Sequence, residues 1–176
     1  MGVDPGMAPE SLLQVMRDKG LILDVLANTH GHHDHIAGNG KVLAETGARL
    51  AAHPDDVPGA DIPLTDGSVL QVGRLEVKVL HTPGHTPGSV AFYVNGAVIT
   101  GDTLFVTRCG RADLPGSDPA ALYRSIGRLA QLPEETLVYP GHDYGPQPVS
   151  TIAFERANNP YMQCPDLESF IKLRMG

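Results

Sequence analysis

Hydrophobic and polar positions follow two different periods along the chain, and together they predict an α/β protein. Residues 9–19 place Leu12 and Met16 on one face, which is typical of an amphipathic helix that ends at Gly20. The apolar run at 21–27 then has the length of a buried strand. The chain therefore begins with a helix that leads into a strand of the core.

Short strands and turns are predicted in the middle of the chain. Residues 75–79 alternate apolar and polar side chains, which is typical of a strand with one face in water. Two further strands, at 90–94 and 97–100, flank Asn95-Gly96, a strong signal for a hairpin. The pattern also predicts a helix at 41–45, strands at 49–52 and 136–139, a helix at about 118–131 that Asp118 caps, and helices at 150–157 and 166–173.

Size and composition are those of one globular domain. No linker or low-complexity tract divides the 176 residues, of which 41% are hydrophobic and 19% charged, so a single domain spanning 1–176 is expected. The net charge of −7 argues against a general nucleic-acid binder or a binder of anionic membranes. No secretory signal is recognisable, and a chain of this size does not need a bridge between its two cysteines, so we expect a cytoplasmic protein.

Histidine and aspartate side chains follow the predicted strands at four places. His30, His32, Asp34 and His35 lie within one short loop, and single candidates follow later in the chain at His85, Asp102 and His142. A neutral imidazole and an ionised carboxylate both bind metal ions near neutral pH. The spacing therefore predicts a pair of adjacent metal ions, whereas His33, His53 and His81 are interpreted as ordinary polar residues.

Four motifs resemble those of the metallo-β-lactamase fold superfamily, in the family's order and over nearly the whole chain: THGHHDH, HTPGHTPGS, GDTLF and YPGHDY. The resemblance implies a four-layer αββα sandwich with the metals at one edge. It implies one ion held by His30, His32 and His85, a second held by Asp34, His35 and His142, and Asp102 bridging both. Asp4 in VDPG matches a family residue that orients a ligand histidine.

The resemblance also concerns the start of the chain. Family members usually have a strand hairpin before VDPG, so the first N-terminal strands of the fold are expected to be lacking here. An uncovered sheet edge invites association, so either a homodimer or reduced stability is expected.

Two divalent ions about 3.5–4 Å apart can share a bridging hydroxide, which is a nucleophile near neutral pH. Asp34 is then predicted to be catalytic, both as a ligand and as acceptor of the proton of that water. The nitrogen and oxygen ligands leave zinc, iron and manganese open. No serine or cysteine nucleophile is needed, and Cys109 is interpreted as a packed thiol of its loop.

The clusters TPGHTPGS, GDTLF and CGR are most similar to glyoxalase II enzymes, which implies a metallohydrolase that cleaves a small-molecule, glutathione-linked thioester. The segment CGRADLPGSDPAALY also resembles persulfide dioxygenases, which implies a single Fe(II) on His30, His85 and Asp102. A non-catalytic metal-binding protein is the third alternative.

Two residues are candidates for contacts with the substrate. Arg111 is expected either to bind an anionic substrate group or to pair with Asp113. Tyr144 is expected either to line the pocket or to pack its loop.

Overall fold

The computed structural model describes all residues, 1–176, and the chain divides into two compact units, Met1–Leu64 and Thr65–Gly176. Each unit contains a sheet and its own helices. The single domain expected from the absence of a linker stays a prediction. None of the helices combines the length and the apolar character that a bilayer-spanning segment requires.

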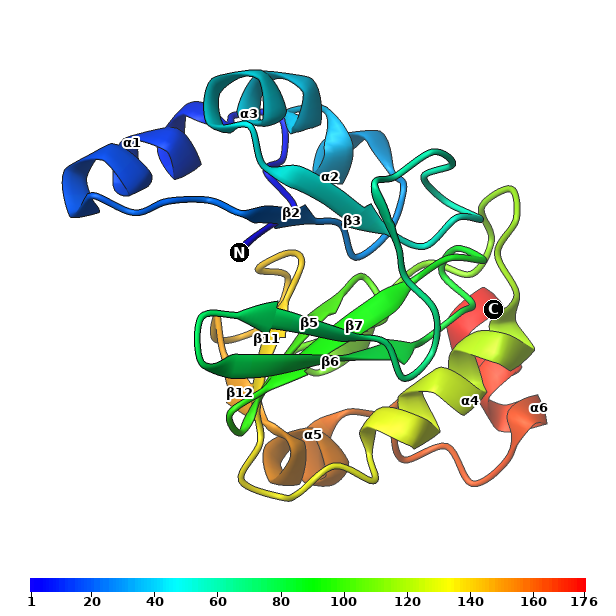
Figure 1. The fold of residues 1–176 in the computed structure, drawn as a ribbon. Coiled ribbons are helices and arrows are strands. Elements are labelled where there is room, and N and C mark those ends of the chain that lie inside the picture. The colour runs from blue at the N-terminus through cyan, green and yellow to red at the C-terminus, as the bar shows by residue number, and fades with distance from the viewer. The chain divides into compact units, whose positions relative to one another are not determined.

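The first unit is built on a parallel sheet with the strand order β1-β2-β3-β4. Its helices α1 and α3 lie on one face of the sheet (Figure 1). A cluster around Leu13, Leu26 and Val42 is buried between them. The elements of this unit are β1 (Gly2–Val3), α1 (Glu10–Lys19), β2 (Val25–Ala27), α2 (His33–Ile36), α3 (Asn39–Thr46), β3 (Arg49–Ala52) and β4 (Ile62–Pro63).

The prediction of a strand over 21–27 was wrong at its beginning. Strand β2 starts only at Val25, and the side chains of Leu21 and Ile22 are 54% and 85% exposed. Gly20 adopts a left-handed φ of 59°, and the Leu21 N–H donates to the Met16 carbonyl. Leu21 therefore belongs to the turn that closes helix α1.

The second unit is built on a mixed sheet with the order β12-β11-β8-β7-β6-β5, in which only the β8–β11 pair is parallel. The predicted hairpin at Asn95-Gly96 is confirmed, since both residues have the positive φ of a type I′ turn, 47° and 74°. The strands are β5 (Val69–Val72), β6 (Leu75–His81), β7 (Val90–Val94), β8 (Ala97–Gly101), β11 (Leu137–Pro140) and β12 (Ser150–Thr151), with a separate hairpin of β9 (Leu104–Phe105) and β10 (Arg108–Cys109).

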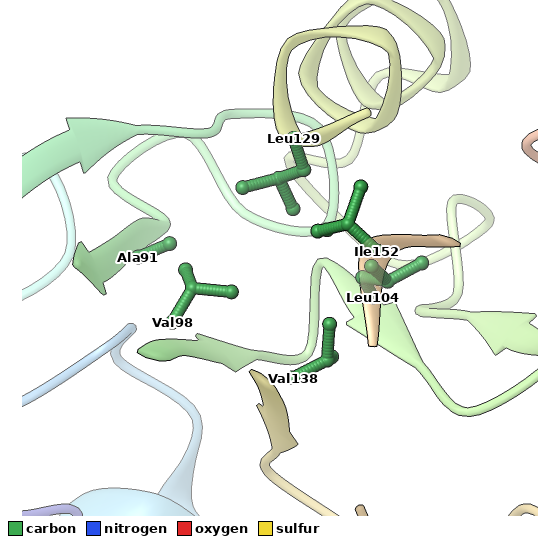
Figure 2. Close-up of a cluster of buried hydrophobic side chains, with 6 residues drawn as sticks. All are labelled: Ala91, Val98, Leu104, Leu129, Val138 and Ile152. Carbon is green, nitrogen blue, oxygen red and sulfur yellow. The ribbon is translucent and has the colours of Figure 1, made fainter. Parts of the chain in front are cut away.

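Three helices lie on one face of this second sheet (Figure 1): α4 (Pro119–Leu129), α5 (Ile152–Asn158) and α6 (Leu167–Met175). As predicted, Asp118 caps α4 by accepting from the N–H groups of Ala120 and Ala121. Figure 2 shows the core between strands and helices, with Ala91, Val98, Leu104 and Val138 facing Leu129 and Ile152. Full burial of such a side chain stabilises the fold by about 1.5–3 kcal/mol, so this core anchors the hairpin strand β9 to α4 and α5.

The sequence pattern missed the shortest elements. Strands β1, β4, β9, β10 and β12 have two residues each, which is too short for any period to be visible. Ser150 and Thr151, predicted as the start of a helix, form β12 instead. Thr151 is the N-cap residue of α5, and its hydroxyl accepts a hydrogen bond from the Phe154 N–H.

Candidate metal centre

The first group of predicted ligands follows strand β2 and continues into the helical turn α2. His30 and His35 are buried, and their ring centroids lie 4.0 Å apart. The ring of His32 lies 4.8 Å from that of His30. Within α2 the side chain of His33 is exposed, whereas Asp34 Oδ2 lies 3.9 Å from His35 Nε2. The turn thus buries the ring of His35 and exposes that of His33, which the sequence analysis had interpreted as an ordinary polar residue.

Asp4 is hydrogen-bonded through both carboxylate oxygens. Its Oδ1 accepts from the Thr29 N–H at 2.8 Å. Its Oδ2 accepts from the Thr29 hydroxyl at 2.6 Å and from His35 Nδ1 at 2.9 Å. Although Asp4, His30 and His35 place donor atoms within 4.8 Å of one another, this carboxylate is engaged by the protein. The geometry suits a residue that orients His35 rather than one that binds the ion itself.

A hydrogen-bond chain also sets the tautomer of His30. Its Nδ1 lies 3.0 Å from the Thr29 hydroxyl, and that hydroxyl donates to Asp4. The Thr29 oxygen must therefore accept a hydrogen bond from the N–H of His30 Nδ1, just as Asp4 accepts one from the N–H of His35 Nδ1. Both imidazoles then carry their proton on Nδ1 and present Nε2 as the metal-binding atom.

Replacing Asp4 by alanine is expected to weaken metal binding about 10–100-fold, because His35 and Thr29 lose the acceptor that orients them. Titration of the metal-free protein with zinc measures this change. Asp61 offers a matched control, since its carboxylate also accepts a backbone N–H, that of Leu50. Equal affinity of the Asp4→Ala and Asp61→Ala proteins would contradict the role of Asp4.

The loop of His30 and His32 has a support that sequence reasoning missed. The N–H of Gly31 donates to Asp56 Oδ2 at 2.9 Å. A Cβ atom at position 31 would lie 2.7 Å from the Asp56 carbonyl oxygen, so only glycine fits between the two histidines. Asp56 is 25 positions away from Gly31, and no local motif could have revealed this contact.

The second group of predicted ligands lies in the second unit around Asp102. Oxygen Oδ2 of Asp102 lies 3.6 Å from His85 Nε2 and 3.5 Å from His142 Nε2. Two ligand atoms at about 2.1 Å from one ion in a tetrahedral arrangement are separated by about 3.4 Å. The three side chains are therefore spaced as ligands of bound divalent cations would be.

His85 is oriented by the backbone of the loop after β10. Its Nδ1 donates to the Arg111 carbonyl oxygen at 2.9 Å, so Nε2 faces Asp102. Gly110, directly before Arg111, packs against the backbone of Asp102: a Cβ atom there would lie 1.9 Å from the Asp102 carbonyl oxygen. The Gly110 carbonyl in turn accepts from Arg174 Nε at 2.7 Å. Sequence reasoning considered only the side chain of Arg111 and missed these backbone contacts.

The Arg111 side chain forms the ion pair that was one of its two predicted roles. Its Nε and Nη2 donate to the two carboxylate oxygens of Asp113 at 2.9 and 2.8 Å. This bidentate hydrogen bond lowers the pKa of Asp113 from its ordinary value to about 2. Nothing tests the role of Arg111 toward a substrate, which stays a prediction.

Tyr144 packs against a predicted ligand. Its ring stacks on that of His142 at 4.9 Å with 15° between the planes, and it meets Phe105 edge-on at 5.2 Å. Tyr144 is 58% exposed, so one side of the ring faces solvent while the other supports His142.

Cys109, His81 and His53, which the sequence analysis did not assign as ligands, make contacts within the protein that serve the fold. Burial raises the pKa of the Cys109 thiol to about 12, so it is not a thiolate at neutral pH, and neither cysteine forms a disulfide. The ring of His81 donates to the Pro87 carbonyl oxygen. His53 Nδ1 accepts from the Asp55 N–H.

These imidazoles and carboxylates, held by hydrogen bonds on their far sides, are typical of a protein that binds divalent metal ions. Residues 3–142 match the metallo-beta-lactamase superfamily, and the chain belongs to this superfamily. The predicted fold class is thereby confirmed. The crystal structure of ETHE1 from Myxococcus xanthus is similar to 99% of this chain and 78% of its own, with a TM-score of 0.93 and 36% identity.

Curated relatives carry two different names. A hydroxyacylglutathione hydrolase of Polaromonas sp. is 41% identical over 152 residues, which are 82% of this chain and 57% of that protein. The human mitochondrial persulfide dioxygenase ETHE1 is 35% identical over 164 residues, 91% of this chain and 64% of that protein. The chain spans about half the length of the first of the hydrolases it matches (47%) and 57% of the second.

Proposed function

We propose that the two groups of ligands together hold a binuclear metal centre. His30, His32 and His85 would bind one ion, Asp34, His35 and His142 the other, and Asp102 both. One observation carries the proposal: a single oxygen of Asp102 lies within 3.6 Å of imidazoles assigned to different ions. When bound, zinc or iron ions (or manganese) supply Lewis acidity and lower the pKa of water to about 7.

The reaction that we propose is hydrolysis of a thioester of the hydroxyacylglutathione type. The name of the 41%-identical Polaromonas relative supports it. Asp34 lies at the edge of its group with 44% of its side chain exposed, so its carboxylate can accept the proton of an attacking water. Asp4 and Thr29 keep His35 and His30 in the tautomer that binds metal.

A second candidate function is a mononuclear iron-dependent persulfide dioxygenase, with His30, His85 and Asp102 as ligands. Its support is the likeness to the ETHE1 structure, which extends over 99% of this chain. Two histidines and one carboxylate with open positions suit oxygen chemistry at Fe(II). The two functions therefore differ in how many of the seven predicted ligands are in use.

Metal content and two assays separate these functions. For the hydrolase we expect about two equivalents of metal per chain and hydrolysis of S-lactoylglutathione. About one equivalent of iron, with oxygen uptake on glutathione persulfide, would instead establish the dioxygenase. A metal-loaded, folded protein without either activity would contradict both candidate functions and leave a non-catalytic metal-binding protein or a hydrolase of an unrelated ester or phosphoester.

Arg111 is proposed to bind an anionic group of the substrate. Replacing it by alanine is expected to raise KM about tenfold and leave kcat nearly unchanged, because a charge-assisted contact to the bound substrate is lost. Steady-state kinetics measure both constants. Arg156→Ala is the matched control, since Arg156 is also exposed and pairs with a carboxylate, that of Glu134. An unchanged KM in Arg111→Ala would assign the residue to its ion pair with Asp113 alone.

Partners and place of action are also proposals. Small thioesters are the proposed partners, with neither nucleic acid nor membrane, in keeping with the net charge of −7. The two free cysteines fit action in the reducing cytoplasm. A homodimer is proposed because β1 is an outer strand of the first sheet, and an unpaired strand edge invites association.

A further inference from the structure

A buried carboxylate lies under the hairpin β9–β10. Glu155 of helix α5 has no exposed surface, and its oxygens accept from Ser150 Oγ at 2.6 Å, the Thr107 N–H at 2.8 Å and Asn159 Nδ2 at 2.8 Å. A buried charge without partners would cost several kcal/mol, and these donors offset that cost. The superfamily ligands predicted from the sequence leave this group without an assigned role.

The carboxylate holds a strained turn. Thr107 lies in the two-residue loop of the hairpin with φ of 60°, a conformation that is unfavourable for a β-branched residue. Its N–H is the one that donates to Glu155. Asn159, also fully buried, donates to the Arg108 carbonyl oxygen at 3.1 Å. Such strain persists only where the surroundings impose it, and here Glu155 and Asn159 do so.

Both ends of this hairpin lead to predicted ligands. Asp102 lies two residues before β9, and Gly110 follows β10 directly and packs on the Asp102 carbonyl without room for a Cβ atom. Arg111, the next residue, accepts from His85 Nδ1 at 2.9 Å. A shift of the hairpin therefore moves the carbonyl that orients His85 relative to the Asp102 carboxylate.

We propose that Glu155 is a positioning residue of the metal centre. Through Thr107 and the hairpin, it maintains the separation between Asp102 and His85 that metal binding requires. This inference rests on the proposed function only in that Asp102 and His85 bind metal, and it holds for either the hydrolase or the dioxygenase.

Titration of the full-length, metal-free protein with Co(II) tests the proposal, because the visible spectrum of Co(II) reports the geometry of its ligands. Glu155→Met keeps the length of the side chain but removes both acceptors. It is expected to weaken Co(II) binding about tenfold or more and to change the spectrum. Glu155→Gln is expected to stay near wild type, since the Ser150 hydroxyl can turn to accept while the amide oxygen still serves Thr107 and Asn159.

A stability control separates positioning from folding. Val77 is buried in β6, near the edge of the six-stranded sheet that lies opposite β12, the strand that leads into helix α5. Val77→Ala is expected to lower the melting temperature while leaving Co(II) affinity and spectrum unchanged. Thr107→Gly is expected to rescue the Glu155→Met variant, because glycine adopts a φ of 60° without strain and does not need the hydrogen bond to Glu155. Adding it to Glu155→Met is expected to restore much of the Co(II) affinity and the spectrum.

The outcomes are distinct. If Glu155→Met loses stability as Val77→Ala does but keeps the wild-type affinity and spectrum, Glu155 serves only the fold and the inference is overturned. If Glu155→Met does not fold, Asn159→Ala replaces it, because it leaves two donors on Glu155 and removes the contact to Arg108. An unchanged affinity and spectrum in that variant overturns the inference equally. A wild-type protein that binds no Co(II) would instead overturn the proposed metal centre itself.

Discussion

Replacing Gly110 by alanine is expected to abolish both metal binding and catalysis. The new Cβ atom would lie 1.9 Å from the Asp102 carbonyl oxygen and 3.0 Å from His85 Nδ1. The first of these is a backbone atom, so the clash cannot be relieved by rotating a flexible side chain. The loop and the Asp102 backbone must separate by more than about 1 Å to reach ordinary contact distance, and a ligand set tolerates much less. Metal content of the purified variant measures the effect.

Gly127 offers the matched control for this substitution. It lies within helix α4, and an added Cβ atom there would meet nothing within 4 Å. Gly127→Ala is expected to stabilise the protein by about 0.5–1 kcal/mol, because alanine favours the helix, and to keep full metal content. Wild-type metal content in Gly110→Ala, in a folded protein, would show that the close approach to Asp102 is not required by the centre.

Replacing His85 by alanine is expected to remove activity and metal together. His85 is buried, its Nδ1 is held by the Arg111 carbonyl, and its Nε2 faces Asp102 at 3.6 Å. Loss of this imidazole removes a proposed ligand from one ion. We expect the metal content to fall by at least one equivalent and kcat/KM to fall by several orders of magnitude. Elemental analysis and the proposed assay report the two losses.

His81 provides the comparison for His85 because it belongs to the same HTPGH run. Its ring donates to the Pro87 carbonyl oxygen, a contact that serves the loop. His81→Ala is therefore expected to keep its metal, with a modest loss of stability. A His85→Ala protein with the full metal complement would contradict the assignment of His85 as a ligand.

The choice between the two candidate functions depends on physical details outside the shared ligands. Imidazole and carboxylate ligands bind zinc and iron alike, so relatives with different chemistry can share one ligand pattern. The backbone contacts of Gly110 and of the Arg111 carbonyl would support a centre of either kind, since they position Asp102 and His85, which both candidate functions use. Metal stoichiometry is for this reason the most informative measurement on this protein.

Several features could be predicted from the sequence because a few neighbouring residues determine them. The hairpin at Asn95-Gly96 needs only two residues that tolerate positive φ, and helix α4 starts where Asp118 can cap it. The burial of His35 and the exposure of His33 follow from the geometry of one helical turn, in which residues two positions apart point to nearly opposite sides. The boundary of strand β2 was wrong because the closing turn of α1 uses Leu21, although its apolar character suits a strand.

The amino-acid sequence by itself determined which side chains are available to bind metal and at which strand ends they lie, since composition and local period are properties of short segments. Only the tertiary structure decided what holds them. The Glu155 contact to Thr107 spans 48 positions, and the Arg174 contact to Gly110 spans 64. Such contacts arise when distant segments pack against each other, and no short stretch of chain contains the information that specifies them.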